Sequence, residues 1–258
     1  MWLLTTDRAE LHFFAIPEDV PDEYAILSHV WNKPPLEPEM SFQDIEYHQR
    51  RCQDTGDHPR DTLPSEKLKG ALAFAERNGY GWLWADMCCI NKTSSTELSE
   101  AINSMYRYYA AAGVCYAYFF DVSSSQPAPA WLEEFWNSEW HERGWTLQEL
   151  VAPKDVLFFA RDWTVLGNKM ALAEVLQLKT RVPKEVLRMQ KNVRSVSVAQ
   201  RMSWAAGRRT TRAEDKAYSL MGIFGVHFVP IYGERDHAFM RLQEQIMKSS
   251  TDMSLFAW

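Results

Sequence analysis

The sequence has 258 residues, of which 46% are hydrophobic and 24% are charged, a balance typical of a globular protein that excludes overall disorder. The formal net charge is −6, whereas nucleic-acid binding needs a basic surface, so nucleic acid is not an expected partner. No stretch approaches the roughly eighteen uncharged apolar residues that a membrane helix needs, so no membrane span is expected.

Short apolar runs predict buried strands, and helical patterns separate them. Strands are expected at 24–28, 81–85, 114–120 and 156–160. Helices are expected at 63–78, from the Ser94-x-x-Glu97 capping box onward and, with an interruption, at 131–151. The polar, proline-rich stretch 32–62 is predicted to be a loop.

This alternation up to residue 160 predicts an α/β fold, with a mostly parallel sheet flanked by crossover helices. Beyond residue 165 the pattern turns mostly helical, at 168–178, 198–206, 214–222 and 236–250. We therefore expect a core at 1–165 and a helical C-terminal extension at 166–258 that packs on it. Ligands of such sheets bind at the carboxyl ends of the strands, which here carry Ser28, His29, Asp86 and Asp121.

Cysteine usage indicates a reducing compartment. Cys52, Cys88, Cys89 and Cys115 show neither C-x-x-C nor paired Cys/His spacing, so a structural zinc site is not expected. The N-terminus lacks the basic start and long apolar stretch of a signal peptide. The sequence therefore predicts a cytoplasmic protein without a metal or a resident cofactor.

Three polar-aromatic segments carry a family resemblance. They read Tyr24-Ala-Ile-Leu-Ser-His-Val-Trp31, Trp82-Leu-Trp-Ala-Asp-Met-Cys-Cys-Ile-Asn91 and Arg143-Gly-Trp-Thr-Leu-Gln-Glu-Leu150. In order and spacing they resemble the motifs of the heterokaryon incompatibility (HET) domain of filamentous fungi, Y-x-x-L-S-x-x-W, W-x-D-x-x-C-I-N and R-x-W-T-x-Q-E. The stretch 201–234 also resembles that family's C-terminal portion. Two positions depart from the pattern, Asn32 where glycine is usual and Lys92 where glutamine is usual.

HET domains are regarded as cell-death effectors in fungal non-self recognition, and they resemble Toll/interleukin-1 receptor (TIR) domains. The resemblance implies a TIR-like, flavodoxin-like sheet. Several TIR domains hydrolyse NAD⁺ with one glutamate in a helical W-x-x-x-E segment, which Trp145 and Glu149 match. The resemblance therefore implies Glu149 as the catalytic residue and NAD⁺ as the substrate. Residues expected to border the substrate are Ser28, His29, Trp31, Asp86, Arg143 and Trp145.

A single carboxylate is chemically sufficient for this reaction. Ordinary glycoside hydrolysis needs two carboxyl groups, because the leaving oxygen must be protonated. Nicotinamide is already cationic in NAD⁺ and leaves as a neutral molecule, so no general acid is required. One carboxylate can then stabilise the positive charge that develops on the ribose.

Other interpretations stay open at this point. Glu149 can instead form a structural ion pair with Arg143 or Lys154. A non-enzymatic signalling module that self-assembles is the alternative function, and a cysteine nucleophile paired with His29 is a third. The resemblance to TIR domains implies a homo-oligomer, since TIR-like enzymes often complete their site between subunits. The sequence contains no repeat array or nucleotide-binding domain, so we expect the trigger to be a separate recognition partner or to be missing from this chain. The basic cluster Arg208, Arg209 and Arg212 is predicted to be a solvated or ion-paired surface.

Overall fold

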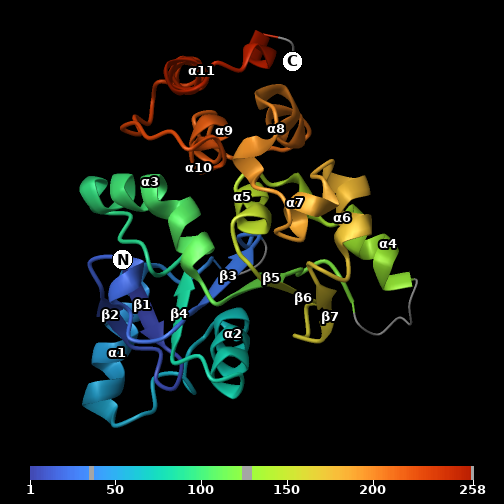
Figure 1. Ribbon diagram of the computed structural model, residues 1–258. Coiled ribbons are helices and arrows are strands. Elements are labelled where there is room, and N and C mark those ends of the chain that lie inside the picture. Colours follow the sequence, from blue (N-terminus) through green and yellow to red (C-terminus); the bar gives the residue numbers. More distant parts are fainter. Residues whose placement is uncertain (35–37, 124–129, 257–258) are drawn as a thin grey trace.

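A seven-stranded sheet forms the centre of the computed structural model, which describes residues 1–34, 38–123 and 130–256 (Figure 1). The strand order is β2-β1-β4-β3-β5-β6-β7. The strands are β1 (Trp2–Thr5), β2 (Leu11–Phe13), β3 (Ala25–His29), β4 (Trp82–Ala85), β5 (Val114–Tyr118), β6 (Val156–Phe159) and β7 (Val165–Asn168).

The four predicted strands form the parallel centre of this sheet. Four parallel strands lie side by side in the order β4, β3, β5 and β6. If these four are numbered as they occur along the chain, their order across the sheet is 2-1-3-4. That is the beginning of the flavodoxin-like order, in which ligands bind where the direction of winding reverses, between the first and third strands. Here that point lies between β3 and β5. The α/β prediction is confirmed, and the likeness to TIR domains stays a prediction.

The edges of the sheet were not predicted. Strands β1 and β2 pair antiparallel beside β4, and β7 pairs antiparallel with β6. These strands have three or four residues each, and β2 and β7 are partly exposed. Segments this short contain too few alternating polar and apolar residues to be recognised as strands from hydrophobic periodicity.

Eleven α-helices and four 3₁₀ helices are assigned in the described part of the chain. The α-helices are α1 (Phe42–Thr55), α2 (Glu66–Arg77), α3 (Ser95–Ala111), α4 (Ala130–Asn137), α5 (Thr146–Val151), α6 (Ala173–Thr180), α7 (Lys184–Leu187), α8 (Val198–Ala205), α9 (Asp215–Tyr218), α10 (Met221–Phe224) and α11 (His237–Ser249). The 3₁₀ helices are η1 (Pro17–Asp19), η2 (Glu139–Glu142), η3 (Val193–Ser195) and η4 (Met253–Phe256). No helix in these ranges is long and apolar enough to cross a membrane.

Helix α1 corrects the prediction of a loop at 32–62. Ser41 accepts from the backbone N–H of Asp44 and its own N–H donates to the Asp44 side chain, which completes a capping box at the helix start. Gly56 closes the helix in the left-handed region, with φ of 77°. The stretch looked like a loop because its apolar stripe is narrow and surrounded by charged residues. Residues 35–37 of the predicted loop lie outside the described residues.

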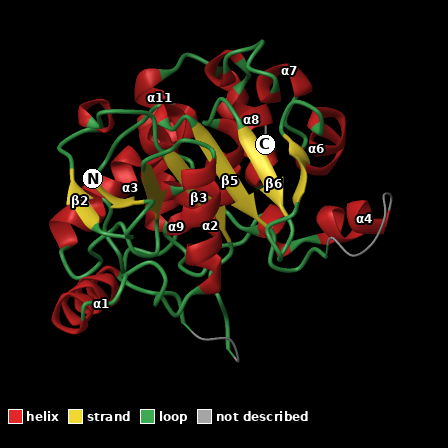
Figure 2. Ribbon diagram, turned by 90° about the horizontal axis from the view of Figure 1, so that it is seen from below, coloured by secondary structure: helices red, strands yellow, loops and turns green. Residues whose placement is uncertain are grey.

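Helices cover the two faces of the sheet unequally. Helix α2 lies across one face, against β4, as Figure 2 shows. Helices α3 and α5 lie on the other face, and the C-terminal helices stack above them, with α10 against α3 and α7 against α5 (Figure 1). The mostly helical character beyond residue 165 and the interrupted helix at 131–151 are confirmed. The helix predicted at 168–178 begins only at Ala173, because Val165–Asn168 form β7. This outer layer brings residues 209–212, Asp215 and Tyr232 to the cavity beyond the carboxyl ends of β3 and β4.

Candidate functional site

A cavity of about 800 Å³ opens where the parallel strands end. Its wall combines the loop after β3, the turn after β4, one face of α3, the η2–α5 segment and a stretch of the C-terminal extension. The volume falls within the roughly 300–1,000 Å³ typical of small-molecule sites. Its polar and aromatic lining residues include Trp31, Asp86, Lys92, Glu142, Arg143, Trp145, Glu149, Arg209, Thr210, Arg212, Asp215 and Tyr232.

Glu149 lies on this wall as a buried carboxyl group, with 5% of the residue exposed. It sits on α5, whose approach to the sheet places it against β3. The Ser28 hydroxyl donates a hydrogen bond to its Oε2 atom, and the indole N–H of Trp140 donates to Ser28 Oγ at 2.8 Å. Among the described residues Glu149 makes no ion pair within 4.0 Å, so the structural pairing with Arg143 or Lys154 is not formed.

Burial dominates the titration of Glu149. Removal of the carboxyl group from water disfavours its charged form, and the nearby charge of Asp86 adds to this effect. The hydrogen bond from Ser28 and the charges of Arg143 and Arg208 act in the opposite direction. Together they raise the pKa of Glu149 to about 8. Perturbed carboxyl groups in clefts are typical of functional sites.

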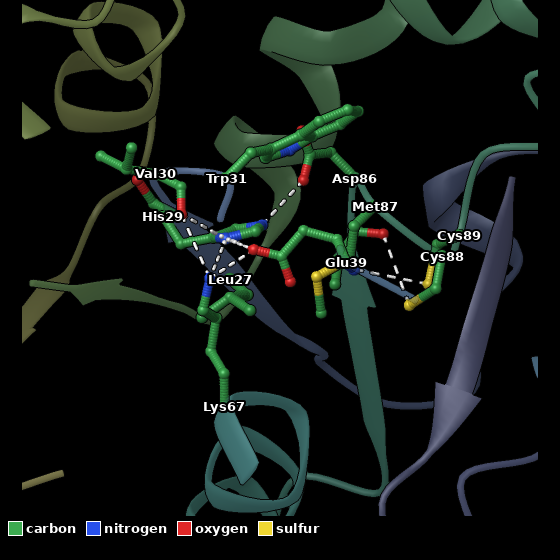
Figure 3. A network of polar contacts seen from close by, with 12 residues as sticks. Leu27, His29, Val30, Trp31, Glu39, Lys67, Asp86, Met87, Cys88 and Cys89 are labelled. Atoms are coloured by element: carbon green, nitrogen blue, oxygen red, sulfur yellow. Dashed lines mark hydrogen bonds and ion pairs between the residues drawn. The ribbon is translucent and has the colours of Figure 1, made fainter. Parts of the chain in front are cut away.

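Asp86, directly after β4, holds the aromatic part of the site. Its Oδ1 lies 3.0 Å from His29 Nε2, and its Oδ2 accepts from the indole N–H of Trp31 at 2.9 Å (Figure 3). Burial opposes ionisation of Asp86, but the hydrogen bond and charge of His29, with the charges of Lys92 and Arg143, outweigh it and lower the pKa. Asp86 therefore stays ionised at neutral pH and fixes the Trp31 side chain.

Lys67 supports this arrangement from the opposite face of the sheet. Figure 3 shows the side chain reaching from α2 to the end of β3. The Lys67 ammonium donates to Val30 O at 3.1 Å and to Glu39 Oε1 at 2.5 Å. It also lies 3.2 Å from His29 Nδ1 and donates to Asn32 Oδ1 at 2.9 Å. Burial lowers the pKa of Lys67, while the Glu39 carboxylate opposes that effect. These contacts tie the cavity-lining loop after β3 to α2.

Two cations flank the Trp31 ring. Lys92 Nζ lies 4.4 Å from its centroid and Arg143 Cζ lies 5.7 Å from it, within the range of cation–π attraction. Lys92 also donates to the backbone carbonyls of Asp86 and Met87, at 2.7 and 2.9 Å. Lys92, which stands where glutamine is usual in the family pattern, therefore stabilises the turn after β4.

The structure brings all seven predicted site residues together, in two groups. Five line the cavity, namely Trp31, Asp86, Arg143, Trp145 and Glu149. Ser28 and His29 are buried behind the wall, where Ser28 holds Glu149 and His29 holds Asp86. Direct substrate contact is therefore predicted for the first group, and a supporting position for the second.

Asp121 and Asn91 have structural partners. Asp121 accepts from Ser138 Oγ at 2.7 Å and from the backbone N–H of Glu139 at 2.8 Å, so it anchors the start of η2. Asn91 accepts from the backbone N–H of Thr93 at 3.2 Å, as a turn former does. Neither lines the cavity.

Sequence reasoning missed the contribution of the C-terminal extension. Residues 209–212, Asp215 and Tyr232 line the cavity, and Tyr232 donates to Asp215 at 3.0 Å. Arg209 and Arg212 are exposed as predicted, but they stand on the cavity wall. The prediction is wrong for Arg208, which is only partly exposed because its guanidinium turns inward and donates to Arg143 O and Thr146 Oγ1, each at 2.8 Å. The resemblance of 201–234 to the family's C-terminal portion was the signal that could have placed them there.

The cysteines are structural in character. All four are free and buried. Cys89 Sγ lies 3.4 Å from the backbone N–H of Ala85, and a hydrogen bond with Cys89 together with burial raises the pKa of Cys88 well above its ordinary value. A nucleophilic cysteine needs a lowered thiol pKa, and the surroundings of Cys88 shift its pKa in the opposite direction. Within the described ranges no group of three or more His, Cys, Asp or Glu side chains is arranged to hold a metal ion.

Comparison with known proteins gives a consistent family. Residues 24–127 match the family described as heterokaryon incompatibility protein (HET), and residues 237–258 match a domain of unknown function, DUF8212. The chain is 42% identical over 230 residues to vegetative incompatibility protein HET-E-1 of Podospora anserina, a match that covers 87% of this chain and 16% of that relative. No solved structure matches the chain significantly. Together with the three motifs, these matches show that the chain belongs to the heterokaryon incompatibility (HET) family.

Proposed function

We propose that the chain hydrolyses NAD⁺ at the bond between nicotinamide and ribose, with Glu149 as the catalytic carboxylate. The observation that carries the proposal is the position of Glu149, a buried carboxyl group that makes no ion pair with any described residue and lies on the wall of the cavity beyond the ends of β3 and β4. A carboxylate there faces developing positive charge in a water-poor environment, where its electrostatic stabilisation is strong.

The reaction needs no bound metal or external acid. The bond between ribose C1′ and the nicotinamide nitrogen breaks, and its electron pair neutralises the pyridinium ring. A water molecule adds to C1′, which yields ADP-ribose, nicotinamide and one proton. The cationic substrate favours the ionised form of Glu149, so its binding opposes the rise in pKa that burial causes.

Aromatic side chains give the cavity a place for the pyridine ring. Trp31 and Trp145 both line it, and Asp86 holds the Trp31 indole in position. Offset stacking on such a ring contributes about 0.5–1.5 kcal/mol beyond the area buried. Trp145 lies one helical turn before Glu149, so the aromatic surface and the carboxylate share one side of α5.

The biological role that we propose follows from the family. The matched relative is named a vegetative incompatibility protein, and we infer that this chain acts in heterokaryon incompatibility, where loss of NAD⁺ kills the cell. In this proposal the chain works in the cytoplasm as a homo-oligomer, and a separate recognition partner switches it on.

An assembly module without catalysis is the second candidate. Exposed apolar side chains on and after α11 favour it, since such groups are often covered by a second copy of a chain. They are Met240, Met247, Met253 and Phe256, with exposed fractions of 54%, 48%, 73% and 69%.

Release of nicotinamide from NAD⁺ by purified protein tests the two candidates, measured by chromatography at several protein concentrations. We expect turnover by wild type and a loss of at least about 100-fold in Glu149→Gln. Glu66→Gln, a change on the opposite face of the sheet at a side chain that is 84% exposed, should keep full activity. Equal rates in wild type and Glu149→Gln would remove Glu149 from the reaction. Absence of turnover at every concentration would favour the assembly module.

A further inference from the structure

Two arginines stand directly opposite each other on the cavity wall. Arg143 and Arg209 form an isolated parallel β-bridge, in which Gly144 N donates to Arg209 O at 2.8 Å and Arg209 N donates to Glu142 O at 2.6 Å. A Cβ atom at Gly144 would come within 2.5 Å of Thr210 Cγ2, so glycine permits this close approach. The backbone therefore holds the two side chains in register.

Like charges in directly opposite positions destabilise a pair of strands unless something compensates them. Neither Arg143 nor Arg209 has a carboxylate within 4.0 Å among the described residues, and Arg143 Nε is a buried donor without an acceptor there. Native proteins rarely leave buried donors unpaired, and an absent ligand is one explanation when they do.

Arg212 adds a third positive charge to the same wall. Its guanidinium lies over the Tyr232 ring at 4.3 Å, which orients the side chain without neutralising it. The other lining cations are engaged elsewhere, because Lys33 pairs with Glu139 and Lys92 donates to backbone carbonyls. Apart from Lys92, which these carbonyls hold, the three arginines are therefore the lining cations that form no ion pair within 4.0 Å in the part of the chain that the structure describes.

We infer that Arg143, Arg209 and Arg212 form an anion subsite that binds the diphosphate of a dinucleotide while Glu149 faces the ribose. This inference rests on the proposed function, since it places two parts of one substrate in one cavity. Planar guanidinium groups suit phosphate oxygens because they donate two parallel hydrogen bonds. The helical extension thus supplies two of the three arginines of the subsite that distinguishes a dinucleotide from its nicotinamide riboside fragment.

Binding of ADP-ribose and of adenosine, measured by calorimetry, tests the subsite independently of turnover. We expect wild type to bind ADP-ribose much more tightly than adenosine, and Arg209→Gln and Arg212→Gln each to weaken ADP-ribose binding by about tenfold or more. Both side chains are exposed, so the variants should fold, which their melting temperatures would verify. Arg50→Gln, on α1 and away from the cavity, is the matched control and should bind as wild type does.

The outcomes separate the subsite from the reaction. Arginine-dependent binding of ADP-ribose in a protein that does not cleave NAD⁺ would support the subsite and reject the hydrolysis. Cleavage that depends on Glu149, with ADP-ribose affinity unchanged in both arginine variants, would reject the subsite and keep the hydrolysis. Failure of wild type to bind ADP-ribose more tightly than adenosine would also overturn the inference.

Discussion

The Ser28 hydroxyl donates to the Glu149 carboxyl group across 121 positions of the sequence. Ser28 lies near the end of β3 and Glu149 on α5, so this bond joins the sheet to the helix that carries the proposed catalytic group. Trp140 donates to a lone pair of the same hydroxyl oxygen at 2.8 Å, which leaves the single hydroxyl proton of Ser28 to point toward Glu149. The carboxyl group is thereby oriented before any substrate binds.

The first prediction concerns pH. Because burial raises the pKa of Glu149 to about 8 and the ionised form is the active one, kcat/KM for NAD⁺ should rise with pH and reach half its maximum near pH 8. The profile of kcat should lie at lower pH, since the bound cation favours the carboxylate. Initial rates between about pH 5.5 and about pH 9 would provide both profiles. A kcat/KM that falls across this range would contradict the carboxylate mechanism.

Ser28 provides a positioning test. Its hydrogen bond lowers the pKa of Glu149 relative to burial alone, so Ser28→Ala should move the kcat/KM profile to higher pH. Ser28→Thr retains the hydroxyl and should restore the profile. Loss of the hydroxyl also leaves the Trp140 N–H unpaired, which costs about 1–3 kcal/mol of stability, so rates are compared below the melting range. A purely structural role would reduce the amount of folded protein without moving the profile.

Glu149 should also reduce the stability of the fold. Its pKa is about 8 when folded and near 4.5 when unfolded, so the folded chain retains a proton that the unfolded chain releases. The free energy of unfolding therefore falls as pH rises from about 4.5 to about 8, by about 3 kcal/mol at pH 7. Glu149→Gln lacks this dependence and should be more stable than wild type at pH 7.5, with little difference near pH 4. Denaturant unfolding at both pH values measures it, and a less stable variant at pH 7.5 would contradict the pKa assignment.

The parallel centre of the fold was predictable because its strands are continuous apolar runs followed by polar residues. Helix α1 and the edge strand β7 were not, since one is too polar and the other too short for a clear period. From the fold alone, site residues could be predicted only at the ends of these apolar strands, where Ser28 and Asp86 lie.

Only those residues of the candidate site that belong to the family motifs or follow the strands could be predicted from the sequence. The family motifs identified Glu149. Its raised pKa results from burial, which the spacing of the motif residues does not reveal. The position of Arg209 beside Arg143 depends on a backbone bridge between segments more than sixty residues apart. Such a contact arises from tertiary packing, so it cannot be predicted from the secondary-structure propensity or the hydrophobic periodicity of either segment.

Lys67 and Glu39 should behave as a coupled buried pair. Lys67→Met leaves the Glu39 carboxylate buried without its partner, and loss of one member of such a pair costs about 3–5 kcal/mol. The double variant Lys67→Met with Glu39→Leu removes both charges and should recover much of that loss. Chemical denaturation of the wild type, both single variants and the double variant gives the coupling energy. Additive losses would show that the pair does not hold the loop after β3.

The last prediction separates a carboxylate mechanism from a thiol mechanism. Cys88 and Cys89 are buried, and the raised pKa of Cys88 keeps its thiol protonated at neutral pH. Thiol-alkylating reagents should therefore react slowly with the folded protein and leave NAD⁺ cleavage intact. Cys89→Ala should cost some stability, because Cys89 is 3% exposed within the core, but should keep kcat/KM. Rapid inactivation by iodoacetamide that Cys89→Ala prevents would place a cysteine in the reaction, and the pH profile would then report a thiol in place of Glu149.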